Sequence, residues 1–152
     1  MDGHKRRVWS FNGDGEQQEG SIWEAAMFAA HYKLDNLVSL IDFNYKQIDG
    51  DVADTMNIEP LADKYRAFNW NVLECNGHDW SEITDVYKET RKLYTSGRPT
   101  AILFHTVMGQ GISYMAGLAE WHGKPPKGEQ VDIALKELGT TEAEWRAYLE
   151  AN

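Results

Sequence analysis

Two polar residues, Asp14 and Asn44, have the types and the spacing of a site that binds a phosphorylated ligand through a metal ion. Asp14 stands in the turn Gly13-Asp14-Gly15, between a short, mostly apolar run and a helical segment that begins near Gly20. Two glycines let the backbone approach a phosphate closely, and the start of a helix offers free N–H groups. Because the carboxylate of Asp14 would repel a phosphate directly, we interpret it as a ligand of a divalent cation that in turn holds the phosphates.

Asn44 follows the apolar run 37–43 and stands thirty positions after Asp14. An aspartate carboxylate, an asparagine side-chain carbonyl and a backbone carbonyl are hard oxygen ligands, which suit magnesium or calcium and bind zinc poorly. Because the protein would supply only a small number of ligands, coordination positions on the cation remain for phosphate oxygens. A GDG turn by itself is more often an ordinary turn, but its combination with an apolar helix, a buried strand and an asparagine behind that strand is much more specific.

Four mostly apolar runs have the pattern of strands, and segments with helical spacing alternate with them. The expected strands are 7–11, 37–43, 70–75 and 100–106. The alternation predicts an α/β fold, a doubly wound, mostly parallel sheet with helices on both faces. Ligands of such sheets bind at the carboxyl ends of the strands. We therefore expect three loops to converge on the site: 13–20, 44–50 and 106–123.

Helical spacing and capping signals predict five helices. They begin near Gly20, near Pro60, after the capping-box pair Asp79 and Glu82, near Gly128, and after the capping-box pair Thr141 and Glu144. Between the fourth strand and the last two helices lies the loop 108–127. A loop of that length in a small domain more often has a function than none.

The helix at 20–30 has two apolar stripes. One consists of Ile22, Ala25, Ala26 and Ala29, and the other of Trp23, Met27 and Ala30. A helix with two apolar faces needs two surfaces to pack on. The sheet can take one stripe, and we expect a partner chain to take the other; a wholly internal helix is the alternative.

Size and charge exclude several classes of protein. With 152 residues the chain is long enough for one domain with its own core, and its net charge of −9 argues against nucleic acid as a partner. No apolar run approaches the roughly 20 residues that span a bilayer, and residues 1–7 are too polar for a signal peptide. A cytoplasmic protein is therefore expected. The single cysteine, Cys75, lies in an apolar run, which favours a buried thiol over a reactive one.

Four segments carry a resemblance to a known family. GDGEQQEGSIWEAA, LDNLVSLIDFN, QIDG and AEWHGKPP resemble the diphosphate-binding half of transketolase, a thiamine diphosphate enzyme, over about residues 7–138. The pair of GDG and Asn44 recurs across the wider thiamine diphosphate superfamily, whereas EQQEG, IDG and the later HG resemble transketolases in particular. The resemblance implies a single diphosphate domain over 1–152 that lacks the usual upstream part of that domain.

The resemblance also implies a metal site and a cofactor site. Asp14, Asn44 and the main-chain carbonyl of Lys46 are implied to coordinate Mg²⁺, with Ca²⁺ or Mn²⁺ as alternatives. The cofactor, thiamine diphosphate, is implied to lie with its diphosphate along Gly13 and Gly15 and beside Asn44.

Two further cofactor contacts come from the same resemblance. Ile48 is implied to pack against the thiazolium ring. His122 matches the histidine between the diphosphate and the reacting substrate oxygens, where an imidazole would hydrogen-bond and transfer protons. Without the resemblance His122 would be interpreted as an ordinary surface histidine.

Some polar residues have looser assignments. Glu19 and Glu24 match acidic positions near the family's subunit interface, although a charged helix start explains them as well. Asp49 is expected to shape the loop after the metal site, with direct metal binding as a lesser option. His31, His78 and His105 receive no role.

The implied function is that of a diphosphate- and metal-binding subunit of a split transketolase, which transfers a two-carbon ketol unit from a ketose phosphate to an aldose phosphate. The pyrimidine domain, which supplies the glutamate that activates the cofactor, would come from a partner chain. A further chain would supply the missing upstream part, in a hetero-oligomer built on a dimer. The alternatives are a subunit of another thiamine diphosphate enzyme, such as a 2-oxo acid dehydrogenase component or a deoxyxylulose phosphate synthase type, or a non-catalytic remnant or scaffold.

Overall fold

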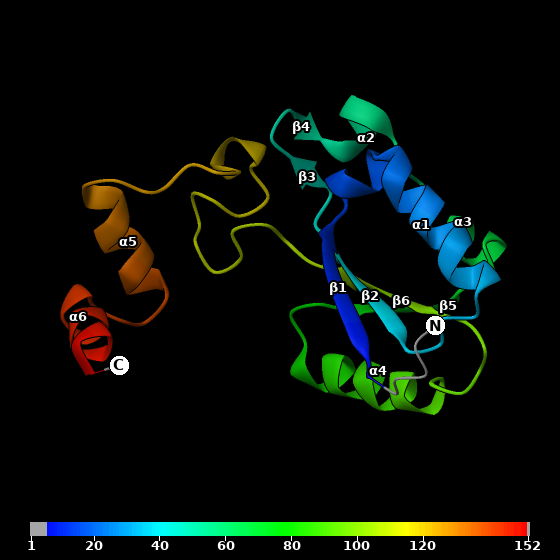
Figure 1. The fold of residues 1–152 in the computed structure, drawn as a ribbon. Coiled ribbons are helices and arrows are strands. Elements are labelled where there is room, and N and C mark those ends of the chain that lie inside the picture. Colours follow the sequence, from blue (N-terminus) through cyan, green and yellow to red (C-terminus); the bar gives the residue numbers. More distant parts are fainter. Residues whose placement is uncertain (1–5, 152) are drawn as a thin grey trace.

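A sheet of four parallel strands is the centre of the computed structural model, which describes residues 6–151 (Figure 1). Across the sheet the order is β1 (Val8–Gly13), β2 (Leu37–Phe43), β6 (Thr100–His105) and β5 (Asn71–Asn76). Gly13 lies opposite Asp42, and His105 lies between Phe43 and Asn76. The carboxyl ends of the strands are therefore level, as a shared ligand site requires.

The two central strands are buried on both sides. Val38 and Ile41 of β2, and Ile102 and Leu103 of β6, are almost inaccessible to solvent. Such near-continuous apolar runs are typical of parallel strands covered by helices on both faces. The edge strand β1 differs, because its residues Val8, Trp9 and Phe11 are exposed.

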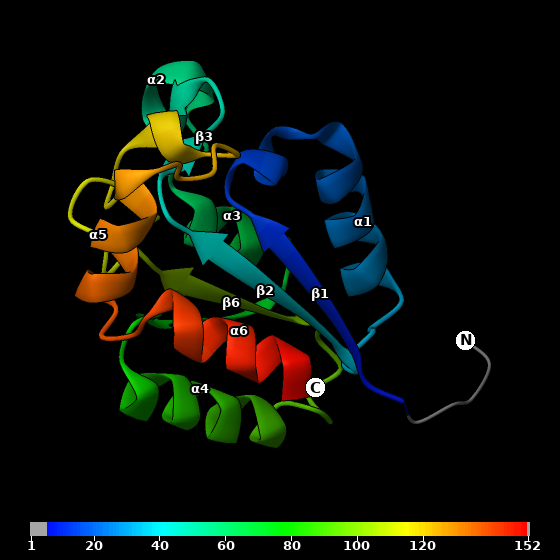
Figure 2. The ribbon, with the colours of Figure 1, turned by 90° about the vertical axis from the view of Figure 1, so that its left-hand side faces the viewer.

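Helices cover both faces of the sheet, so the prediction of a doubly wound fold is confirmed. Figures 1 and 2 show α1 (Gly20–His31) and α3 (Leu61–Ala67) over one face and α4 (Trp80–Lys92) over the other. The larger core cluster joins α1 and α3 to the sheet, and a smaller one joins α4 to it. Cys75 is buried in β5, and burial raises its pKa to about 11, which agrees with the predicted inert thiol.

The capping signals identified two helix starts correctly. Asp79 Oδ1 accepts hydrogen bonds from the N–H groups of Ser81 and Glu82 at the start of α4, although Glu82 itself bonds the N–H of Asn76. At α6 (Glu142–Ala151), the pair Thr141 and Glu144 forms the reciprocal bonds of a full capping box.

The segment after β2 was predicted as a plain loop, and this was wrong. It contains the short antiparallel pair β3 (Lys46–Gln47) and β4 (Gly50–Asp51), followed by the helix α2 (Val52–Met56). Strands of two residues are too short to show any periodicity in the sequence. The hairpin places Ile48 at its tip, 76% exposed.

The assignment of the apolar stripes of α1 was partly wrong. Trp23 and Ala30, expected to face a partner, pack against the core with Ala26. Trp23 Nε1 donates a hydrogen bond to the carbonyl of Gln17. These three positions lie on one helical face, so the buried stripe is rotated from the predicted one. Met27 is exposed, as expected.

The loop after β6 leads away from the sheet to α5 (Glu129–Glu137) and α6, which stand apart from it in Figure 1. Ser113 anchors the loop to α5, because its N–H and its hydroxyl both donate to the Glu137 carboxylate, at 2.7 and 2.6 Å. Within residues 6–151, no helix combines the length and the apolar character needed to cross a membrane.

The exposed edge of β1 predicts that the isolated chain associates, because unpaired backbone groups flanked by apolar side chains attract other strands. Light scattering on the purified chain should show a dimer or a larger species. Phe11→Lys places a charge on this edge and should shift the chain toward monomer. Trp80→Lys is the matched control, since Trp80 is 81% exposed at the start of α4 and is not part of the β1 edge. A wild-type monomer at micromolar concentration would contradict the prediction.

Candidate functional site

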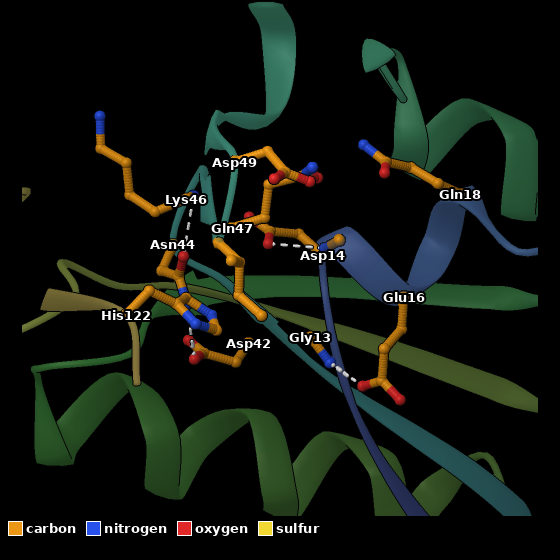
Figure 3. Close-up of a pocket in the computed structure, with 12 residues that line it drawn as sticks. Gly13, Asp14, Glu16, Gln18, Asp42, Asn44, Lys46, Gln47, Asp49 and His122 are labelled. Carbon is orange, nitrogen blue, oxygen red and sulfur yellow. Dashed lines mark hydrogen bonds between the residues drawn. The ribbon is translucent and has the colours of Figure 1, made fainter. Parts of the chain in front are cut away.

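A cavity of about 450 Å³ opens at the carboxyl end of the sheet (Figure 3). It brings together every residue that the sequence predicted for the site: Gly13, Asp14, Gly15, Asn44, Lys46, Ile48 and His122. Glu16, Gln18, Asp42, Gln47 and Asp49 complete its lining. The co-location of these residues is observed, and the individual role of each stays a prediction.

Asp14 is the most buried charged group of the cavity, with 1% of its surface exposed. Its Oδ1 accepts a hydrogen bond from the N–H of Gly15 at 2.8 Å, and its Oδ2 accepts one from the N–H of Tyr45 at 2.5 Å. Burial raises the pKa of this carboxyl, and the two hydrogen bonds partly oppose the rise. Among the described residues, no cationic side chain pairs with Asp14.

Asn44 is oriented by an aspartate that the sequence analysis missed. Its Nδ2 donates to Asp42 Oδ2 at 2.9 Å, and its Oδ1 accepts from the N–H of Lys46 at 2.9 Å. The other oxygen of Asp42 accepts a short hydrogen bond from the hydroxyl of Thr106. Asp42 thereby fixes which way the amide of Asn44 faces. Its signal in the sequence was a single acidic residue near the end of an otherwise apolar strand.

Gly15 lies close to the hairpin, where there is little room for a side chain. A Cβ at this position would lie 3.3 Å from Gln47 Cβ and 3.4 Å from Gln47 Oε1. The same Oε1 is buried and has no hydrogen-bond partner within the described part of the chain. An acceptor without a protein donor at the wall of a cavity is available to a ligand group, a cation or a water molecule.

The oxygens of the cavity fit a hard divalent cation. Asp14, Asp42, Asp49 and the amide oxygen of Gln47 all line it, and Glu16 Oε2 accepts a hydrogen bond from the N–H of Gly13. Residues 6–151 contain no cluster of three or more His, Cys, Asp or Glu side chains arranged to hold a metal. A cation here would therefore depend on amide, carbonyl and ligand oxygens as well as on Asp14, which is a donor set that suits Mg²⁺.

His122 reaches the cavity from the long loop, directly after a short 3-10 helix (Ala119–Trp121). The loop closes on itself upstream, where the N–H of Gly117 donates to the carbonyl of Met108. Gly109 has φ +72°, and a Cβ there would come within 2.9 Å of the backbone of Met115. Glycine at this position therefore allows the loop to fold tightly before it leads to His122.

Similarity to known proteins identifies the family. Residues 2–147 match the family model described as transketolase, thiamine diphosphate binding domain. The chain belongs to the transketolase family. A transketolase from Campylobacter jejuni superposes with a TM-score of 0.81 at 31% identity over 90% of this chain and 21% of its own.

Two curated transketolase relatives are of particular interest, and each is named as one subunit of its enzyme. The chain is 44% identical over 139 residues to a subunit of the apulose-4-phosphate transketolase of Phocaeicola vulgatus. The aligned region covers 91% of this chain and 48% of the relative. It is 38% identical over 138 residues to the 6-deoxy-6-sulfo-D-fructose transketolase subunit SqwG of a Clostridium species, over 91% of this chain and 50% of the relative. The chain thus spans about half the length of these relatives.

The other polar residues predicted for this chain lie outside the cavity, except Asp49. Glu19 precedes α1 without capping it, and Glu24 is exposed on that helix. The interface role of these two residues stays a prediction. His31 contacts the ring of Tyr32, and His78 accepts the N–H of Val107.

Asp42→Ala should lower the free energy of unfolding by about 1–3 kcal/mol, since it leaves donor groups of Asn44 and Thr106 without their acceptor. Urea denaturation of the metal-free chain measures this change. Asp85→Ala is the matched control, because Asp85 is exposed on α4 and its ion pair with Lys88 is exposed and contributes little. Equal denaturation midpoints for the two variants would show that Asp42 does not organise the site.

Proposed function

We propose that this chain is the diphosphate- and metal-binding subunit of a split transketolase, which transfers a two-carbon ketol unit between a ketose phosphate and an aldose phosphate. The observation that carries the proposal is the buried Asp14 carboxylate beside Asn44, in one cavity with Ile48 and His122. The names of the two relatives support it, because both are subunits of transketolases.

In this proposal the cation is Mg²⁺, held by Asp14, the side-chain oxygen of Asn44 and the main-chain carbonyl of Lys46. The raised pKa of Asp14 favours the proposal, since a nearby cation would offset the cost of burying the charged carboxylate. Gly13 and Gly15 line the place of the diphosphate, where the absence of side chains allows close approach. When bound, thiamine diphosphate supplies the carbanion chemistry that ketol transfer requires.

His122 is proposed as the residue that binds the reacting substrate oxygens and exchanges protons with them. Its exposed side chain lies on the wall of the cavity that the sugar phosphate would enter. An imidazole can act as donor and as acceptor near neutral pH, which suits a group that serves both directions of a reversible transfer. Ile48, exposed at the hairpin tip, gives the cofactor an apolar surface to lie against.

The partner is proposed to be a chain that carries a pyrimidine domain with the activating glutamate. The uncovered edge of β1 supports a further contact, because Trp9 and Phe11 are 42% and 71% exposed there. We assign this edge to the chain segment that supplies the rest of the diphosphate domain. The whole would be a hetero-oligomer built on a dimer.

Asp14→Ala should abolish metal-dependent binding of thiamine diphosphate, measured by calorimetry on the assembled complex. The loss should exceed about a hundredfold, since even outer partners of metal ligands typically contribute 10- to 100-fold. The control is again Asp85→Ala, on the far face of the sheet from α1 and α3. Unchanged affinity in Asp14→Ala would contradict the metal assignment.

Ketol transfer should be absent from this chain alone, even with saturating cofactor, and should appear when a pyrimidine-domain chain is added. Loss of a positioned acid or base typically lowers a rate by about a hundredfold to ten-thousandfold, and loss of the orienting surface lowers it further. The assay follows consumption of a ketose phosphate with an aldose phosphate as acceptor.

In the mixed complex, His122→Ala should lower turnover by about a hundredfold or more. His31→Ala, at the end of α1 and outside the cavity, is the control. Turnover by the lone chain would mean that the reaction or its catalytic groups are misassigned.

A further inference from the structure

Tyr45 stands between two proposed metal ligands, Asn44 and Lys46, in a backbone conformation that tyrosine rarely adopts. Its φ is +65°, in the left-handed region. Such a conformation persists in a bulky residue only when the surroundings hold it in place. Both backbone groups of Tyr45 are engaged, since its N–H donates to Asp14 Oδ2 and its carbonyl accepts the N–H of Val52 at 3.0 Å. These two hydrogen bonds tie the turn at Tyr45 to Asp14, which follows β1, and to Val52 at the start of α2.

The side chain of Tyr45 has a specific partner at the end of the neighbouring strand. Its hydroxyl lies 2.7 Å from Nδ1 of His105, the last residue of β6. Its ring packs against Phe43, with 4.4 Å between the ring centroids. A phenol hydroxyl can donate its proton to an imidazole nitrogen, so the distance of 2.7 Å fits a hydrogen bond from Tyr45 to His105.

The second ring nitrogen of His105 also has a partner. Its Nε2 lies 3.1 Å from Glu74 Oε2 on β5, and Glu74 Oε1 accepts from Arg66 of α3 at 3.0 Å. One neutral form of the imidazole satisfies both contacts, with Nε2–H donating to Glu74 and Nδ1 accepting from Tyr45. The row of hydrogen bonds therefore runs along the carboxyl edge of the sheet, from the loop after β2 through β6 to β5.

We infer that Tyr45 and His105 are positioning residues, whose hydrogen bond holds the left-handed turn that presents Asn44 and the Lys46 carbonyl to the cation. The inference rests on the proposed function, because it assumes that this loop binds a metal. Neither residue is part of the lining of the cavity. A purely structural contact would stabilise the fold without changing the metal affinity of the folded chain, and this difference can be measured.

Three substitutions distinguish the contact at Nδ1 of His105 from the contact at Nε2. Tyr45→Phe removes only the hydroxyl. His105→Asn places a polar atom near the position of Nδ1, so the contact with the Tyr45 hydroxyl is kept. His105→Gln places a polar atom near the position of Nε2, so the contact with Glu74 is kept and the contact with Tyr45 is lost. Tyr87→Phe on α4 is the control for loss of a tyrosine hydroxyl outside the cavity.

The measurement is the affinity of the assembled complex for Mn²⁺ in the presence of thiamine diphosphate. The electron paramagnetic resonance signal of free Mn²⁺ reports it. Tyr45→Phe and His105→Gln should bind Mn²⁺ about tenfold more weakly, as is typical when a partner of a metal ligand is lost. His105→Asn and Tyr87→Phe should stay within about twofold of the wild type, given that the Tyr45 contact is kept. Thermal unfolding of the metal-free variants reports their stability separately.

Wild-type affinity in both Tyr45→Phe and His105→Gln would overturn the inference, whether or not their thermal stability falls. If the assembled wild-type complex binds no Mn²⁺, the proposed function fails first. Hydrogen exchange of the Tyr45 amide then decides the positioning claim. Faster exchange in Tyr45→Phe and His105→Gln than in His105→Asn would support it, and equal rates in all three would overturn it.

Discussion

The buried carboxylate of Asp14 is the interaction on which the rest of the site depends. Only 1% of its surface is exposed, and burial raises its pKa, so its charged form is destabilised unless something compensates. The N–H groups of Gly15 and Tyr45 supply part of that compensation. A divalent cation would supply the rest, which explains why an acidic turn can precede a diphosphate site.

The sheet makes this arrangement possible because its strands end level. Gly13 opposes Asp42, and Phe43 opposes His105, so the groups that orient Asn44 and Tyr45 lie along one edge. The buried interiors of β2 and β6 fix that edge, since a slip of either strand by one residue would exchange the side chains of its two faces and disrupt the packing of both core clusters.

Much of the fold could be predicted from the sequence because it depends on local or strongly periodic signals. The strands at 37–43 and 100–106 are buried on both faces and were located to within a residue. Two helix starts followed from Asp79 and Thr141. The rotation of α1 could not be obtained in this way, because alanines fill both of its apolar stripes and contrast too little to show which one is buried.

The residues of the site also divide into those that a local pattern predicted and those that it did not. Asp14 and Asn44 could be found from their places behind two strands, whereas Lys46, Ile48 and His122 were reached only through the resemblance to transketolases. Sheet topology predicted that the loop 106–123 reaches the site, but the path of a long loop is not encoded in a local pattern, so nothing nearby in the sequence singled out His122 within it. The contact of Tyr45 with His105 joins residues far apart in the chain, and a histidine at a strand end carries no signal of its own.

The most direct test of the central claim is a crystal structure of the chain soaked with Mn²⁺ and thiamine diphosphate, read by anomalous scattering of the manganese. The account predicts an anomalous peak within bonding distance of Asp14, Asn44 and the carbonyl of Lys46, with cofactor phosphate oxygens completing the coordination. A peak held instead by Asp49 or Asp51, or no peak in this cavity at full cofactor occupancy, would contradict it.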